Sequence, residues 1–187
     1  MPARGPAADR GSAPHYTGYM TTAITLIEPA QNEFLADLEK RARRPVHFFR
    51  LMANRPEVLK NFVPLYGSIM GPGSVDQRTK ELVYLTVSYA NKCAYCTAAH
   101  VASGRKAGVT EDEMHALQAE QNGGFSAPER AAIQYARELT RTADGAQTRD
   151  ALNAHYNDEQ IVEITLVAAI ANFTNRLNNG LDLQPEQ

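Results

Sequence analysis

The chain has 187 residues, of which 43% are hydrophobic and 21% charged, and its formal net charge is −2. This composition is ordinary for a globular protein that buries a hydrophobic core, in one domain or in two small packed halves. A net charge this close to zero does not indicate the basic surface of a nucleic-acid-binding protein. No continuous stretch of the sequence reaches the ~18 apolar residues that a membrane-spanning helix needs. We therefore expect neither nucleic acid nor a membrane as a partner.

The start of the chain and its cysteines indicate the domain organisation and the compartment. Residues 1–22 are rich in proline and glycine and lack the apolar segment of a secretory signal. We predict a disordered leader over 1–22 and a single helical domain over 23–187. The two cysteines, Cys93 and Cys96, are three positions apart, whereas a secreted disulfide framework uses more, spread along the chain. A lone C-x-x-C indicates redox or metal chemistry in a reducing, cytoplasmic compartment.

Helix start and stop signals recur from residue 28 onward, and the alternating pattern of strands does not. Ser74 and Gln77 form a capping-box pattern, Asn91 is a candidate N-cap, and Pro64 predicts a kink or break. The predicted helices span about 29–42, 46–52, 56–69, 75–90, 93–107, a short stretch after 110, 126–141 and 157–177. The expected fold is all-α, with about eight helices.

Two ten-residue segments resemble each other. Residues 76–85 read DQRTKELVYL and residues 158–167 read DEQIVEITLV. Each places a glutamate five residues after an aspartate, then an apolar run, then an asparagine near the end of that run. The pattern suggests two related helical halves, of which the first carries the cysteines, although two amphipathic helices also match this well by chance.

The chemistry-bearing residues lie around the cysteines. On one helix, Cys93, Cys96 and His100 occupy positions i, i+3 and i+7 and share a face. The cysteines are then close enough for a disulfide across one turn, and His100 is within reach of the Cys96 sulfur, directly or through a water. The attacking species in thiol chemistry is the thiolate. The helix N-terminus favours Cys93 as the more acidic thiol, whereas His100 would accept a proton from Cys96.

Glu81 lies in the preceding helix, among leucines, so its carboxylate is expected to be partly buried and to need a partner. That partner is predicted to be His100, with Arg78, one turn back, as the alternative. Zinc is the rival interpretation of two cysteines and a histidine. A structural zinc site needs four ligands, and the chain has no second C-x-x-C or histidine pair. We therefore expect no metal and no cofactor.

The pattern Glu-x11-Cys-x2-Cys-x3-His, at Glu81, Cys93, Cys96 and His100, resembles the active-site signature of the alkylhydroperoxidase D-like (AhpD-like) proteins of the carboxymuconolactone decarboxylase superfamily. Residues 45–125 look like the core domain of that family, and residues 172–177 (NFTNRL) look like a tail of its peroxidase-related members. The resemblance implies an AhpD-like helical fold, homotrimers or homohexamers, and reduction of hydroperoxides without metal or flavin.

By the same resemblance, Cys96 is the peroxidatic thiol, Cys93 resolves its sulfenic acid into a Cys93–Cys96 disulfide, and Glu81 and His100 relay protons. A dithiol donor, a lipoylated or a thioredoxin-like protein, would then reduce the disulfide. Tyr95 stands where the best-known member has a histidine, and it cannot take a proton near neutral pH, which leaves the substrate open. The alternative functions are a redox sensor or disulfide-exchange protein without efficient turnover, and a zinc-stabilised helical module.

Overall fold

The computed structural model describes residues 24–186, so the predicted leader at 1–22 lies outside the described residues. The described part contains a short 3-10 helix, η1 (Pro29–Gln31), nine α-helices and no strand. The α-helices are α1 (Glu33–Ala42), α2 (His47–Met52), α3 (Pro56–Met70), α4 (Gln77–Ala90), α5 (Ala94–Lys106), α6 (Glu111–Gln118), α7 (Ala127–Thr142), α8 (Ala146–Asn153) and α9 (Asp158–Gly180). The predicted all-α fold is confirmed.

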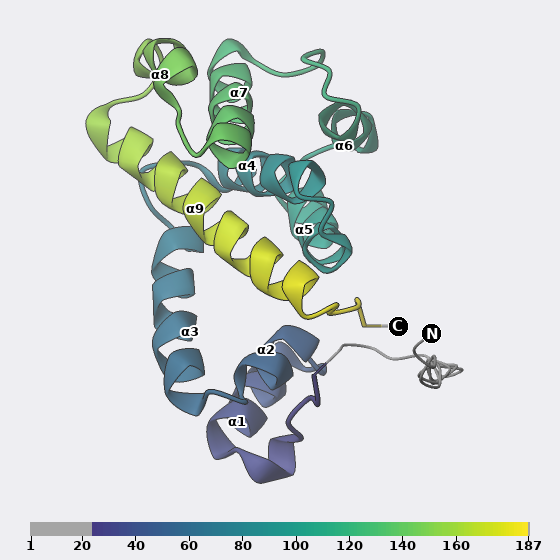
Figure 1. Ribbon diagram of the computed structural model, residues 1–187. Helices are drawn as coiled ribbons and strands as arrows, with labels where there is room; N and C mark the ends of the chain where they lie inside the picture. Colours follow the sequence, from purple (N-terminus) through teal and green to yellow (C-terminus); the bar gives the residue numbers. More distant parts are fainter. Residues whose placement is uncertain (1–23, 187) are drawn as a thin grey trace, which may run out of the picture.

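Helix α4 is the buried helix of the upper part of the molecule in Figure 1, where it lies beside α5, α7 and α9. Ten consecutive residues, 79–88, are buried, and α4 contacts α5, α6, α7 and α9. A helix that is buried on every side belongs to the core of a domain. Helix α9 crosses the molecule and also contacts α3, α5, α7 and α8, so it joins the two ends of the fold. None of the helices within residues 24–186 is long and apolar enough to cross a bilayer.

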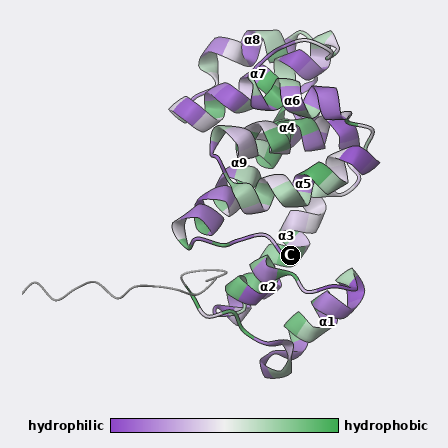
Figure 2. Ribbon diagram, turned by 90° about the vertical axis from the view of Figure 1, so that its right-hand side faces the viewer, coloured by the Kyte–Doolittle hydropathy of each residue, from purple (hydrophilic) through white to green (hydrophobic). Residues whose placement is uncertain are grey.

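Two hydrophobic clusters meet at α4. Leu82 and Leu85 pack into a small cluster with Phe125 and Ile133 from the segment around α7. The opposite side of α4 joins a larger cluster that reaches from α1 to the end of the chain. In Figure 2 the hydrophobic colour gathers on the central helices, and the outer helices show long hydrophilic stretches. Each fully buried leucine contributes about 1.5–3 kcal/mol through removal of apolar surface from water.

A buried lysine connects α4 to the start of α9. The Lys80 side chain is completely buried and forms an ion pair with Glu163 of α9. Its Nζ donates to the carbonyls of Ile69, at 2.9 Å, and Gly71, at 2.6 Å. Glu163 in turn accepts hydrogen bonds from the Ser74 amide, at 2.8 Å, and hydroxyl, at 2.6 Å. Because the buried ammonium is paired and hydrogen-bonded, it fixes the loop between α3 and α4.

One tertiary contact and one local cap explain why two predicted helix starts were wrong. Since the Ser74 hydroxyl is bound to Glu163, it does not cap α4, and Asp76 does so by accepting from the Thr79 amide at 2.9 Å. The first predicted helix is divided into η1 and α1, because Asn32 accepts from the Leu35 amide at 3.0 Å and begins a new helix.

Two further differences concern Pro64 and α8. Pro64, at which a kink or a break was predicted, does not break α3, which is one helix around it, and the kink stays a prediction. The proline is exposed, so the carbonyl that loses its partner one turn earlier is free to bind water. Helix α8 was not predicted, because its N-cap Gly145 offers no side-chain cap and Leu152 is its one buried residue.

The suggested internal repeat stays a prediction. Its two segments begin α4 and α9, which pack against each other. Asp76 is the N-cap of α4, whereas Asp158 is the first helical residue of α9, after the N-cap Asn157. The two matching glutamates have different partners, since Glu81 binds a histidine and Glu163 binds a lysine.

Candidate active site

The turn between α4 and α5 positions the first cysteine. The Cys93 amide donates to the Ser88 carbonyl and the Lys92 amide to the Tyr89 carbonyl, both at 3.0 Å, which is the hydrogen-bond pattern of a Schellman motif. Lys92 adopts the left-handed conformation that this motif requires, with φ of 53°. The prediction that Asn91 caps the cysteine helix was therefore wrong. Asn91 is the C-cap of α4, and Cys93 itself is the N-cap of α5.

The cysteines lie together at the start of α5. The Cys93 Sγ accepts a hydrogen bond from the Cys96 amide at 3.3 Å, as an N-cap side chain does. Both side chains are buried, and both are free thiols. The Cys93–Cys96 disulfide remains a prediction of the redox cycle.

The two thiols differ in acidity. A hydrogen bond from the Cys96 side chain lowers the pKa of the Cys93 thiol below its ordinary value, and backbone amides add to this. The same hydrogen bond, together with burial and the charge of Cys93, raises the pKa of Cys96 well above its ordinary value. The first proton of the pair therefore leaves Cys93, in agreement with the argument from the helix N-terminus.

Helix α4 brings Glu81 to His100 of α5. The Glu81 carboxylate is buried, and its Oε2 lies 2.7 Å from His100 Nδ1. Gln77 supports the other oxygen by donating to it at 3.0 Å. Arg78, the alternative partner, is occupied by the carboxylates of Glu113 and Glu129. The structure thus resolves the choice between His100 and Arg78 in favour of His100.

The second ring nitrogen of His100 faces α3. Its Nε2 lies 3.1 Å from the Tyr66 hydroxyl, and its ring stacks on Tyr84 at a centroid distance of 3.4 Å. Because the Glu81 carboxylate accepts from Nδ1–H, Nε2 is the acceptor for the Tyr66 hydroxyl. Burial raises the pKa of Tyr66 above its ordinary value, so the hydroxyl keeps its proton. Glu81, His100 and Tyr66 form one hydrogen-bonded chain.

Helix α9 supplies a hydrogen-bond donor to the Cys96 thiol. The Asn178 amide nitrogen donates to the Cys96 Sγ at 3.2 Å, and the side chain is buried. His100 was predicted to reach the Cys96 sulfur directly or through a water. The structure gives the two side chains other direct partners, since Cys96 binds Asn178 and Nε2 of His100 binds Tyr66, and contact through a water stays a prediction. A donor to the sulfur stabilises the thiolate over the thiol.

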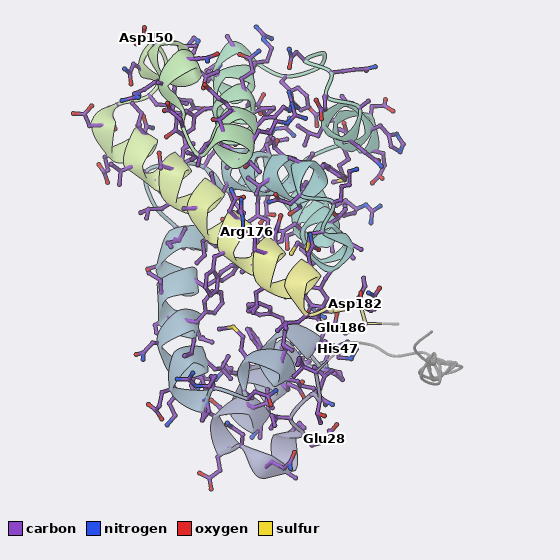
Figure 3. The ribbon with its side chains drawn as sticks, viewed as in Figure 1. Glu28, His47, Asp150, Arg176, Asp182 and Glu186 are labelled. Carbon is purple, nitrogen blue, oxygen red and sulfur yellow. The ribbon has the colours of Figure 1, made fainter. Side chains whose placement is uncertain are left out.

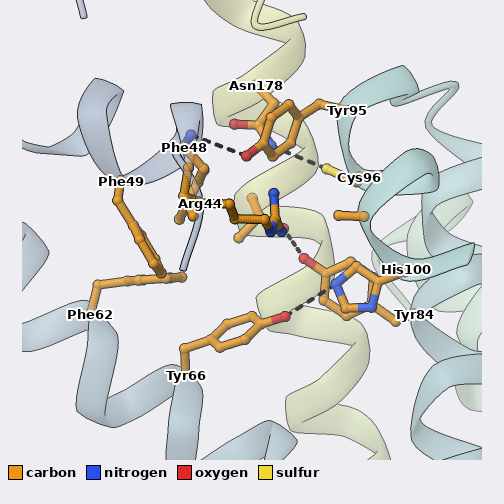
Figure 4. Close-up of a pocket in the computed structure, with 13 residues that line it drawn as sticks. Arg44, Phe48, Phe49, Phe62, Tyr66, Tyr84, Tyr95, Cys96, His100 and Asn178 are labelled. Carbon is orange, nitrogen blue, oxygen red and sulfur yellow. Dashed lines mark hydrogen bonds between the residues drawn. The ribbon is translucent and has the colours of Figure 1, made fainter. Parts of the chain in front are cut away.

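A cavity of about 130 Å³ lies between α2, α3, α5 and α9 and opens on Cys96 (Figure 4). Its polar wall contains Arg44, Cys96, His100 and Asn178. The rest of the wall is largely aromatic, with Phe48, Phe49, Phe62, Tyr66, Tyr84 and Tyr95, and is completed by Val46, Ala99 and Thr174. Cys93 is not part of this wall, so a molecule in the cavity meets Cys96 first.

Tyr95 lines the cavity, but its hydroxyl is bound elsewhere. It donates to Glu186 at 2.8 Å and accepts from the Phe48 amide at 3.2 Å. Glu186 also accepts from the His47 amide at 2.7 Å, and Figure 3 shows these two residues side by side where the chain after α9 reaches α2. Tyr95 therefore anchors the C-terminal segment and lies outside the hydrogen-bonded chain of His100.

A second cavity, of about 700 Å³, borders Cys93. It is more open and more polar, and its wall includes Lys92, Gln118, Glu120 and Arg141. The two cysteines thus face two different cavities. Within residues 24–186, no three His, Cys, Asp or Glu side chains are arranged to hold a metal ion.

The sequence pattern missed Tyr66 and Asn178, along with Tyr84, which supports the ring of His100. Tyr66 is 34 positions from His100, and Asn178 is 82 positions from Cys96, so no local spacing relates them. One signal for Asn178 was present. It follows the NFTNRL segment near the end of a predicted amphipathic helix, and a polar residue on a buried face needs a partner.

The fold and the site together define an all-helical protein with a buried C-x-x-C and a Glu–His pair. The family model of the carboxymuconolactone decarboxylase family matches residues 56–138. The uncharacterized protein YdfG of Bacillus subtilis is 32% identical over 111 residues, which cover 56% of this chain and 74% of that protein. The chain belongs to the carboxymuconolactone decarboxylase family.

Solved structures place the fold among the AhpD-like members. A peroxidase-related protein from Ralstonia eutropha JMP134, described as an alkylhydroperoxidase AhpD core, has a TM-score of 0.80 at 19% identity, covering 91% of this chain and 95% of that one. A peroxidase-related protein from Silicibacter sp. TM1040 has a TM-score of 0.77 at 23% identity, covering 91% and 94%. The debrominase Bmp8 has a TM-score of 0.76 at 21% identity, covering 90% and 93%. At these identities the likeness shows the fold.

Proposed function

We propose that this protein is a thiol-dependent peroxidase that reduces organic hydroperoxides through Cys96 and Cys93. One observation carries the proposal: Cys96 lies at the wall of an apolar cavity that also contains the proton-handling His100 and Tyr66. A nucleophile, a proton relay and a dry binding volume are the parts that this reaction needs. The family membership and the AhpD-like fold support the same class of chemistry.

The proposed cycle begins when one proton of the thiol pair passes, through a water molecule in the cavity, to Nε2 of His100, whose imidazolium is balanced by Glu81. Cys96 gives its remaining proton to Cys93 and attacks the terminal oxygen of a hydroperoxide ROOH. The O–O bond breaks and an S–O bond forms, which leaves Cys96 as a sulfenic acid and releases an alkoxide. The alkoxide takes a proton from the Tyr66 hydroxyl, which is replaced from His100, and leaves as ROH.

The Cys96 sulfenic acid is then converted to a disulfide at the same end of α5. Cys93 attacks the sulfur of the Cys96 sulfenic acid, the S–O bond breaks, and hydroxide leaves with the Cys93 proton as water. In this scheme the greater acidity of Cys93 does not make it the peroxidatic thiol. Cys93 holds the negative charge in the resting pair, whereas Cys96 faces the cavity.

Reduction of the disulfide is proposed to use the second cavity. A thiolate of a dithiol donor, lipoylated or thioredoxin-like, attacks the Cys93 Sγ and releases Cys96 as a thiolate, and the second donor thiol then frees Cys93. The open, polar cavity at Cys93 supports this approach, because it leaves the hydroperoxide cavity unobstructed.

The test is thiol titration with peptide mass mapping. We expect a molar excess of cumene hydroperoxide to remove both free thiols and to yield one intramolecular disulfide between Cys93 and Cys96. Dihydrolipoamide or reduced thioredoxin should then support many turnovers. If both thiols stay free after the hydroperoxide, the proposal is wrong. Oxidation without turnover by either donor would favour the redox sensor, and stoichiometric zinc in elemental analysis would favour the zinc-stabilised module.

The aromatic wall of the cavity supports a second candidate substrate, an aryl bromide. Such a substrate would consume the same two electrons, as ArBr and the dithiol yield ArH, the disulfide and HBr. The structure of a debrominase with this fold is the reason to include the reaction in the assay. Bromide release from a tribromopyrrole at a rate above that of hydroperoxide reduction would assign the site to dehalogenation.

We further propose that the chain forms a homotrimer or homohexamer through α3 and α9. Three apolar side chains on these helices are exposed, Leu65 by 52%, Val162 by 57% and Leu166 by 45%, and they line one shallow hollow. Burying them against a second copy would remove their apolar surface from water. Sedimentation equilibrium at micromolar concentration should give three or six times the chain mass. A stable monomer there would contradict this proposal.

A further inference from the structure

The cavity at Cys96 has a cation at its opening. Of the residues that line this cavity, Arg44 is the only exposed one and the only one with a permanent charge. Its side chain is 57% exposed, so a molecule that enters the cavity can reach it. In the view of Figure 4, Arg44 lies between Phe48 on one side and Cys96 and His100 on the other. The cavity therefore combines a largely aromatic wall, a thiol inside and a guanidinium at the opening.

The guanidinium of Arg44 has donors that its ion pair with Glu186 does not use. The Arg44 Nη1 lies 3.7 Å from the Glu186 Oε2, which is longer than a hydrogen bond. The other oxygen of Glu186 accepts from the Tyr95 hydroxyl at 2.8 Å and from the His47 amide at 2.7 Å. These two hydrogen bonds attach the C-terminal segment, so the long ion pair is not required for it. Because a guanidinium has five N–H donors, Arg44 can bind a further acceptor.

The acceptor that suits Arg44 is a carboxylate. A guanidinium binds a carboxylate through two parallel hydrogen bonds, and its single charge balances that of a carboxylate, whereas a phosphate carries nearly two charges. In this same chain one guanidinium holds two carboxylates at once, since Arg78 binds both Glu113 and Glu129. The nearby Glu186 therefore does not prevent Arg44 from binding a second carboxylate.

We propose that Arg44 is a specificity-determining residue that binds the carboxylate of an acidic organic hydroperoxide. The inference rests on the proposed peroxidase function and names its substrate class, an apolar body with a carboxylate at one end and a hydroperoxide group at the other. With the carboxylate on Arg44 at the opening, the apolar body packs against the aromatic wall and the hydroperoxide group is directed inward, toward Cys96. Hydrogen peroxide has neither a carboxylate nor an apolar body, so this arrangement favours organic acids over it.

The test compares acids with their neutral esters. The probes are the 3-carboxy and 4-carboxy derivatives of cumene hydroperoxide and the methyl ester of each, so the ring and the peroxide are the same within a pair. The rate of Cys96 oxidation in reduced protein is followed by peptide mass, and the acid rate is divided by the ester rate. At low ionic strength we expect this ratio to be about fivefold higher in wild type than in R44Q for at least one pair, the upper range for a partly exposed ion pair.

R43Q is the matched control, because Arg43 is exposed, precedes Arg44 and is not part of the cavity wall. It removes the same charge from the chain, and its acid-to-ester ratio should equal that of the wild type. Salt provides a measurement without any substitution, since about 0.5 M NaCl screens an exposed ion pair and should lower the wild-type ratio toward that of R44Q.

Two results would overturn the role of Arg44: equal ratios in wild type and R44Q for both pairs, or a loss of the same size in R43Q. Failure of the proposed function is a distinct result. In that case the esters and the acids alike would leave wild-type Cys96 unoxidised.

Discussion

Replacement of Cys96 by serine is expected to reduce hydroperoxide consumption to the level of buffer, a loss of more than about a thousandfold. The reason is that a serine hydroxyl in the same place is far less acidic than a thiol and is not a nucleophile toward peroxide oxygen near neutral pH. Consumption of cumene hydroperoxide with excess dihydrolipoamide measures the effect. The fold should be retained, since the exchange is nearly isosteric in a buried position.

Cys93→Ser is the matched control, because it leaves the thiol that faces the cavity. This variant should consume one equivalent of hydroperoxide and then stop, with Cys96 trapped as a sulfenic acid that dimedone labels. The opposite pattern, in which C96S is oxidised and C93S is inert, would make Cys93 the attacking thiol. That outcome would mean that the lowered pKa of Cys93 matters more than the access of Cys96 to the cavity.

Glu81→Gln is expected to lower the rate of Cys96 oxidation by about a hundredfold or more, within the range usual for general acid–base groups. The glutamine keeps the shape of the buried side chain but removes the negative charge 2.7 Å from His100 Nδ1. Without that charge, the imidazolium formed by the thiol proton is no longer balanced in a buried site. Stopped-flow oxidation of reduced protein by hydroperoxide, across a range of pH, is the measurement.

Tyr66→Phe provides a graded comparison. It keeps the aromatic wall and removes the hydroxyl that lies 3.1 Å from His100 Nε2. If Tyr66 passes the proton to the leaving alkoxide, Y66F should lose less than E81Q, and the loss should be greatest for hydroperoxides whose alcohols are weak acids, since these need protonation most. Equal rates in wild type, E81Q and Y66F would exclude a proton relay at this site.

Much of the candidate site was predictable because its parts are local. The spacing of Cys93, Cys96 and His100 on a helix needs only the helical repeat, and the need of a buried Glu81 for a partner needs only the cost of an unpaired charge. The helix starts were less predictable. Ser74 carries a capping signature, but its hydroxyl binds Glu163, which is 89 positions away in the sequence.

The sequence alone determined that the chain is helical, that its two thiols and one imidazole lie within about two turns of one another, and which family it resembles. These properties follow from periodicity and spacing within a few turns of chain. The tertiary structure decided that His100 binds Tyr66, that Asn178 holds Cys96, and that Cys96 and not Cys93 faces the aromatic cavity. These contacts depend on how α3 and α9 pack around α4 and α5, and packing joins residues whose separation in the sequence carries no signal.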